Sequence, residues 1–151
     1  MTGFSWDWAF AWSILPTLLE GFAVTIQATI AGSAIAVSGG LVLCLVRLSR
    51  VPVLSHIVWF AVEFLRGTPF LVQLYFAFYV LPKYGIIFSP LVTGILALGI
   101  YGSARATEFY RAALEAVPVG QWEASLTLGR PIRSVWRRII LPQMWPSARS
   151  M

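Results

Sequence analysis

Charged residues stand inside segments that are otherwise apolar, and they are the side chains best placed to do chemistry in this chain. Glu63 and Arg66 lie three residues apart, a spacing at which a helix brings opposite charges onto one face. Thr68 and Gln73 continue a partly polar face beyond this pair, across a glycine and a proline that loosen or kink a helix. Two interpretations stay open: a helix that lines a polar cavity or gate, and a structural ion pair inside a membrane.

Catalytic motifs do not accompany these charges. His56 is the one histidine, and the sequence has no His-Glu-x-x-His pair, no Gly-x-Ser-x-Gly and no paired aspartates for a metal. Cys44 is the one cysteine and lies in an apolar stretch, which excludes an intramolecular disulfide and favours a packing role. We therefore predict no catalytic residue, no metal site, no cofactor and no enzymatic activity.

The composition excludes a soluble domain of ordinary type. Of the 151 residues, 58% are hydrophobic and only 11% are charged. Three stretches, about 17–46, 53–81 and 85–110, are long enough at about 1.5 Å per residue to cross the roughly 30 Å hydrocarbon layer. The fold class that we predict is an all-α integral membrane protein with three transmembrane helices.

Basic residues indicate the orientation of these spans. Arg47 follows the first span and Arg111 the third, with further arginines downstream, whereas no Lys or Arg precedes the first span. This bias predicts an N-terminus outside the cell and a cytoplasmic segment from about Arg111 onward. Because topology accounts for the net charge of +5, we predict no nucleic-acid partner. Arg105, Glu108 and Arg111 again pair opposite charges at a spacing of three, near enough to the cytoplasm to snorkel.

A helix-turn-helix is predicted over residues 117–142. Trp122 begins an apolar i, i+4 pattern that ends at Gly129, where a left-handed helix cap fits. Pro131 suits the first position of a second helix, whose apolar stripe includes Ile139 and whose pattern ends at Pro142. Two short amphipathic helices at a glycine hinge are suited to presenting a rigid surface to another protein. An amphipathic hairpin that lies on the inner membrane surface is the alternative.

The spacing in this segment resembles the EAA loop of ABC importer permeases. The matching positions are Glu123, Ala124, Ser125, Gly129, Ile139, Leu141 and Pro142, with Ser125 in place of the usual second alanine. Residues 63–73 and 115–124 are similar to the polar amino-acid branch of that family, which includes histidine, glutamate, glutamine, arginine and opine permeases. The chain also resembles permeases for ectoine or hydroxyectoine.

This resemblance implies a permease subunit of an ATP-driven importer of amino acids or a related small polar solute. The helix that holds Trp122, Glu123 and Leu128 would be the coupling helix, seated on a cytoplasmic ABC ATPase subunit. The other implied partners are a second permease, identical or paralogous, an extracytoplasmic solute-binding protein and membrane lipid. The implied location is the bacterial inner membrane, crossed several times.

The predicted permease domain covers residues 1–143, and residues 144–151 are expected to be a short non-matching tail. Members of the family continue beyond the Leu-Pro motif with further spans, whereas this chain stops at Met151. We expect a truncated gene, a frame change near residue 144 or an incomplete sequence. The alternative function is a truncated, non-transporting membrane interaction subunit that retains binding to the ATPase or to another permease.

Overall fold

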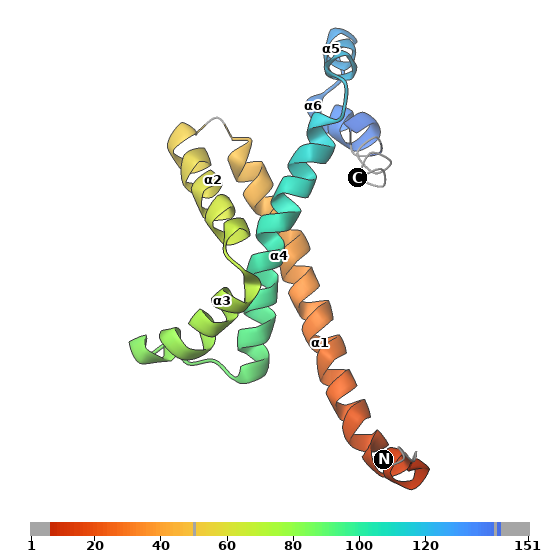
Figure 1. The fold of residues 1–151 in the computed structure, drawn as a ribbon. Coiled ribbons are helices and arrows are strands. Elements are labelled where there is room, and N and C mark those ends of the chain that lie inside the picture. The colour runs from red at the N-terminus through yellow and green to blue at the C-terminus, as the bar shows by residue number, and fades with distance from the viewer. Residues whose placement is uncertain (1–6, 50, 141, 143–151) are drawn as a thin grey trace, which may run out of the picture.

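The computed structural model describes residues 7–49, 51–140 and 142, and the regular elements in these ranges are all helical (Figure 1). The elements are α1 (Trp8–Arg47), α2 (Pro52–Gly67), α3 (Phe70–Tyr75), the π-helical turn η1 (Phe76–Val80), the 3-10 turn η2 (Leu81–Tyr84), α4 (Pro90–Glu115), α5 (Val119–Thr127), α6 (Ile132–Val135) and the π-helical turn η3 (Trp136–Ile140). The predicted all-α class is confirmed.

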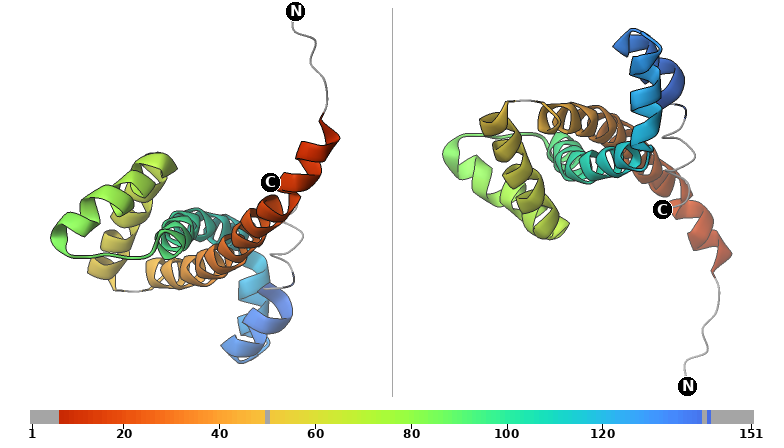
Figure 2. Two further views of the ribbon diagram at one scale, coloured as in Figure 1. Left: turned by 90° about the horizontal axis from the view of Figure 1, so that it is seen from below. Right: turned by 90° about the horizontal axis from the view of Figure 1, so that it is seen from above.

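Helix α1 is the long axis of the molecule. Asp7 caps its start, because the carboxylate accepts a hydrogen bond of 3.0 Å from the Phe10 N–H, so the helix begins before the predicted boundary near residue 17. Its 40 residues extend about 60 Å, twice the thickness of the hydrocarbon layer. Figure 2 shows the N-terminal part of α1 extending away from the other helices. Of the described helices, α1 is the one that by itself is long and apolar enough to cross a membrane.

The segment predicted as one span over 53–81 is broken in the structure. Helix α2 and the α3–η2 segment meet at an angle of 103°. Thr68 takes an extended conformation because it precedes Pro69, and Pro69 has no N–H to continue the helical hydrogen bonds. The kink indicated by Gly67 and Pro69 is therefore a sharp bend. Taken together, the two pieces are a second candidate span by length and composition.

Helix α4 runs beside α1 in the same direction, and α2 runs opposite to both (Figure 1). Ser89 caps the start of α4 by accepting a hydrogen bond from the Val92 N–H, and Pro90 occupies the first turn. Helix α2 packs against both α1 and α4, and it contributes Val58 and Val62 to a small apolar core with Ala104 of α4.

Small residues let α1 and α4 approach closely. A Cβ atom at Gly40 would lie 2.5 Å from Ala106 Cβ and 3.0 Å from the Ser103 carbonyl oxygen, so only glycine fits there. The Thr107 hydroxyl donates a hydrogen bond of 3.2 Å to the Gly40 carbonyl, and the Ser103 hydroxyl donates one of 3.1 Å to the Ile35 carbonyl. The contact thus combines close backbone packing with hydrogen bonds between the helices.

Candidate functional site

Glu108 is the centre of an ion-pair cluster that joins three helices. Its carboxylate pairs with Arg47 at the end of α1 and lies 2.9 Å from the Arg111 guanidinium one turn further along α4. Arg66 of α2 is 3.9 Å away. The side chains of Arg47 and Glu108 are each only 17% exposed, so these charges depend on one another for stabilisation. The cluster fixes one end of α1, α2 and α4 together.

The predicted pair of Glu63 and Arg66 is present on one face of α2. Their charged atoms are 3.5 Å apart, and the Glu63 side chain is 57% exposed. Arg66 extends this pair to Glu108, which places both residues at the edge of the cluster and away from the cavity described below. The ion pair is present, and a role of these two side chains in a polar gate stays a prediction.

Arg105 differs from the spacing-based prediction. Glu108 pairs with Arg111 at the predicted spacing, and Arg111 also pairs with Glu115, but no ion pair joins Arg105 to Glu108. The Arg105 guanidinium instead lies against Tyr101, one helical turn toward the start of α4. Spacing therefore predicts the partner of Arg111 correctly and the partner of Arg105 wrongly.

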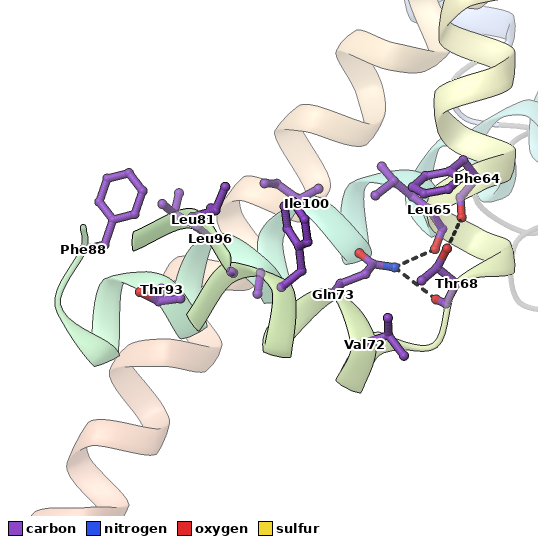
Figure 3. Close-up of a pocket in the computed structure, with 13 residues that line it drawn as sticks. Phe64, Leu65, Thr68, Val72, Gln73, Leu81, Phe88, Thr93, Leu96 and Ile100 are labelled. Atoms are coloured by element: carbon purple, nitrogen blue, oxygen red, sulfur yellow. Dashed lines mark hydrogen bonds between the residues drawn. The ribbon is translucent and has the colours of Figure 1, made fainter. Parts of the chain in front are cut away.

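Thr68 and Gln73 line a cavity at the bend between α2 and α3 (Figure 3). Its volume is about 450 Å³, and apart from Thr93 the rest of its lining is apolar and comes from α2, α3, η1, η2, α4 and the loop before α4. The Gln73 amide nitrogen donates hydrogen bonds of 2.8 Å to the Leu65 carbonyl and 3.0 Å to the Thr68 carbonyl. Gln73 therefore satisfies the carbonyl groups that the bend leaves without helical partners.

The helix-turn-helix has a defined hinge. Gly129 adopts φ +65°, the left-handed conformation that favours glycine at the end of a helix. The Arg130 N–H donates a 3.4 Å hydrogen bond to the Ser125 carbonyl across this turn. Ser125 itself is buried, and its hydroxyl donates a 2.6 Å hydrogen bond to the Gln121 carbonyl. Close packing at this position suits a small side chain.

An apolar cluster holds the helix-turn-helix on the end of α4. Val117 and Val135 are buried against each other, and Leu114, Trp136 and Ile139 pack around them. Ile139 therefore anchors the second helix to α4. In Figure 1, α5 projects beyond the end of α4, remote from α3.

The remaining residues predicted for the coupling surface lie on the outside of this anchored unit or are not described. Glu123 and Ala124 are exposed on α5, Leu128 is 74% exposed, and Pro142 is exposed. Trp122 belongs to α5, but its side chain is not described, and Leu141 lies outside the described residues. Among the described residues predicted for coupling, Ile139 thus anchors the helix-turn-helix, whereas Glu123, Ala124 and Leu128 are exposed.

Residues 32–149 match a family described as the binding-protein-dependent transport system inner membrane component. The chain belongs to this family. The match runs through residues 144–149, which were expected to be a non-matching tail. The resemblance to ABC importer permeases is confirmed, and a membrane transport component is not an enzyme, as predicted.

Two relatives and one solved structure locate the chain within the family. It is 44% identical over 149 residues to the probable amino-acid ABC transporter permease protein y4tG of Sinorhizobium fredii (strain NBRC 101917 / NGR234), covering 95% of this chain and 64% of that protein. It is 35% identical over 142 residues to the L-cystine transport system permease protein TcyB of Bacillus subtilis (strain 168), covering 94% and 60%. A crystal structure of an amino acid ABC transporter with histidines superposes with a TM-score of 0.85 at 29% identity, covering 97% of this chain and 71% of that chain. The chain therefore spans 60 to 64% of the length of these two relatives.

Sequence reasoning missed the role of Arg47. This residue was read as a marker of topology, whereas it pairs with Glu108 across the contact between α1 and α4. One signal was present: small residues in both helices, Gly39 and Gly40 in the first and Gly99 and Gly102 in the second, allow close approach. The small residues predict that the two helices pack together, and the positions of the charges along them then place Arg47 near Glu108.

Proposed function

We propose that this chain is a permease subunit of an ATP-driven importer of amino acids or a related small polar solute. In this proposal α1, the bent pair of α2 and α3–η2, and α4 each cross the bacterial inner membrane. The N-terminus lies outside, and the helix-turn-helix lies in the cytoplasm, in agreement with the distribution of basic residues.

The attachment of α6 and η3 to the end of α4, with α5 packed against α6, is the observation that carries this proposal. The Val117–Val135 cluster makes a rigid joint, while Glu123, Ala124 and Leu128 remain available on the outside. A cytoplasmic ABC ATPase subunit that binds this exposed surface would displace α4 through α6 and η3. The Glu108 cluster would pass the displacement to α1 and α2 through Arg47 and Arg66. Packed, stiff contacts of this kind can carry a displacement from the surface of α5 to α1 and α2.

The complete importer would contain further components. They are a second permease, identical or paralogous, and an extracytoplasmic solute-binding protein that delivers the solute to the outer face. The names of the relatives support an amino acid as the solute, and L-cystine is one example. The relatives described above are not named for ectoine or hydroxyectoine, so that expectation stays a prediction.

The test replaces Gly129 by valine in the chain assembled with the ATPase, the second permease and the solute-binding protein of its importer. A β-branched residue at φ +65° costs about 1–3 kcal/mol of backbone strain, so the turn should rearrange and displace α5. We expect ATP hydrolysis to continue in proteoliposomes while amino-acid uptake per ATP falls by about tenfold or more, the factor that about 1.4 kcal/mol represents.

Gly21→Val is the matched control, because Gly21 also has open space around a Cβ atom but has no positive φ and lies in α1, outside the helix-turn-helix. This variant should transport as the wild type does. Normal coupling in Gly129→Val would contradict docking through the helix-turn-helix. A wild-type chain that binds the ATPase without any uptake would instead indicate the non-transporting interaction subunit.

A further inference from the structure

Arg105 stands apart from the other arginines of α1, α2 and α4. Arg47, Arg66 and Arg111 each pair with at least one glutamate. Arg105 is exposed, and among the described residues it forms no ion pair; its polar contact is with the Tyr101 hydroxyl. A guanidinium is always charged in proteins, so this cation has room for an anion that the described part of the chain does not supply.

The Arg105 side chain turns toward the start of α4, which is away from the cytoplasmic surface in the proposed topology. A snorkelling arginine near the inner end of a span would extend toward that surface, which here means toward the end of α4. The Arg105 guanidinium instead turns back by one helical turn and lies 4.7 Å from the centre of the Tyr101 ring. The Tyr101 ring in turn lies 5.2 Å from the ring of Phe70, at the start of α3. The charge is thus held beside the bend between α2 and α3.

In the topology proposed above, in which α4 spans the membrane from Pro90 inward, the charge lies within the membrane. By Arg105, α4 has risen about 22 Å from Pro90, at about 1.5 Å per residue, into a hydrocarbon layer of roughly 30 Å. A charged side chain at such a depth is unfavourable and usually marks a pathway for an ion or solute. The contacts with Tyr101 stabilise the guanidinium only in part, because an aromatic ring and a neutral hydroxyl do not neutralise its charge.

We propose that Arg105 and Tyr101 form a binding site for the carboxylate of the transported amino acid. A guanidinium offers two parallel N–H groups to a carboxylate, and this bidentate geometry is specific for planar anions. The Tyr101 oxygen accepts a hydrogen bond from Arg105, so its own O–H can donate to the same carboxylate. The site rests on the proposed function, since it assigns a role to the solute of that transport reaction.

The experiment measures binding to the permease without the solute-binding protein. The chain is reconstituted in nanodiscs with its ATPase and partner permease, and equilibrium dialysis identifies which radiolabelled standard amino acid binds most tightly. That amino acid is then compared with its amide, in which the carboxylate becomes a neutral carboxamide. We expect Arg105→Gln to weaken binding of the acid by about tenfold or more, as loss of a charged hydrogen bond predicts, and to leave the amide unaffected.

Two further variants sharpen this result. Arg105→Lys keeps the charge and should recover part of the affinity for the acid, while Tyr101→Phe keeps the ring and should weaken it by a smaller factor than Arg105→Gln. Arg130→Gln is the control, because Arg130 is exposed in the helix-turn-helix, remote from α3. If Arg105→Gln fails to assemble, Tyr101→Phe decides, and unchanged binding of the acid in that variant overturns the site.

Other outcomes would also overturn the site. Arg105→Gln that binds the acid as the wild type does but loses stabilisation by phosphatidylglycerol would assign Arg105 to a lipid headgroup. If Arg105→Gln binds the acid as the wild type does but the second permease is recovered poorly with it, Arg105 pairs with a carboxylate of that permease instead. A wild-type complex that binds no amino acid overturns the site even if uptake with the binding protein is normal, whereas absence of both ATPase binding and uptake overturns the proposed function itself.

Discussion

Helix α4 makes two different kinds of contact with its neighbours. Against α1 it presents small residues, and the Thr107 and Ser103 hydroxyl groups bond to carbonyl groups of the facing helix. Beside α3 it presents Leu96 and Ile100, which line a cavity of about 450 Å³ next to a 103° bend. The contact with α1 leaves no space for side chains to move, whereas the contact beside α3 leaves a cavity into which they can move.

This difference indicates where the molecule can change shape. Close-packed helices move together, because separating them loses many short contacts at once. A bend next to a cavity can open or close with smaller losses, since its broken hydrogen bonds are already replaced by the Gln73 amide. We therefore expect α1 and α4 to move as one unit during transport, while α3 changes its angle relative to them.

Gly40→Val should break the tight contact and have the largest effect. The new Cβ would lie 2.5 Å from Ala106 Cβ and close to α4 backbone atoms, which cannot move aside as a flexible side chain does. Overpacking of this kind costs about 1–3 kcal/mol, and more where backbone is involved. We expect a clear fall in the melting temperature of the detergent-solubilised protein, measured by circular dichroism.

Gly94→Val is the matched control for this substitution. Gly94 also lies within a long helix, four residues after the start of α4, but a Cβ atom there has open space around it. Its melting temperature should stay close to that of the wild type. Equal losses in the two variants would show that helical glycine itself, and not close packing between α1 and α4, sets the stability.

Glu108→Gln should have the next largest effect. Glu108 contacts Arg47 on the tight side of α4, which packs against α1, and Arg66 of α2, which leads to the loose side beside α3 and the cavity. Removing its charge leaves Arg47 without a carboxylate partner at 17% exposure, and breaking a largely buried pair costs up to about 3 kcal/mol. Glu115→Gln is the control: it removes a carboxylate that is 63% exposed, for which a loss below about 1 kcal/mol is expected. Similar unfolding temperatures for the two variants would contradict a central role for Glu108.

Local patterns allowed part of this architecture to be predicted from the sequence. The bend between α2 and α3 follows from Gly67 and Pro69, and the hinge of the helix-turn-helix follows from Gly129, because proline and glycine restrict or free the backbone wherever they occur. The pair of Glu63 and Arg66 follows from helical spacing. These features need no knowledge of which helices are neighbours.

Other features depend on how the helices pack and could not be predicted. The pairing of Arg47 with Glu108 requires the ends of α1 and α4 to meet, and this pairing leaves Arg105 to contact Tyr101 of its own helix instead of Glu108. Gln73 lies on a partly polar face, as predicted, but its amide serves backbone carbonyl groups across the bend. Sequence spacing describes one helix at a time, and these outcomes are decided between helices.

Gln73→Leu should have the smallest effect of the three substitutions on stability and should act on the loose side alone. It removes two hydrogen bonds to the Leu65 and Thr68 carbonyl groups, each contributing about 1 kcal/mol, and part of this loss is regained because leucine fits the apolar cavity. We expect a modest fall in melting temperature together with faster amide hydrogen exchange around Thr68, while exchange in the α1–α4 contact stays unchanged. Gln27→Leu, on an exposed face of α1, is the control and should alter neither measurement. Faster exchange on both sides of α4 would mean that the two contacts are not independent, and the proposal that α3 moves against a fixed α1–α4 unit would have to be abandoned.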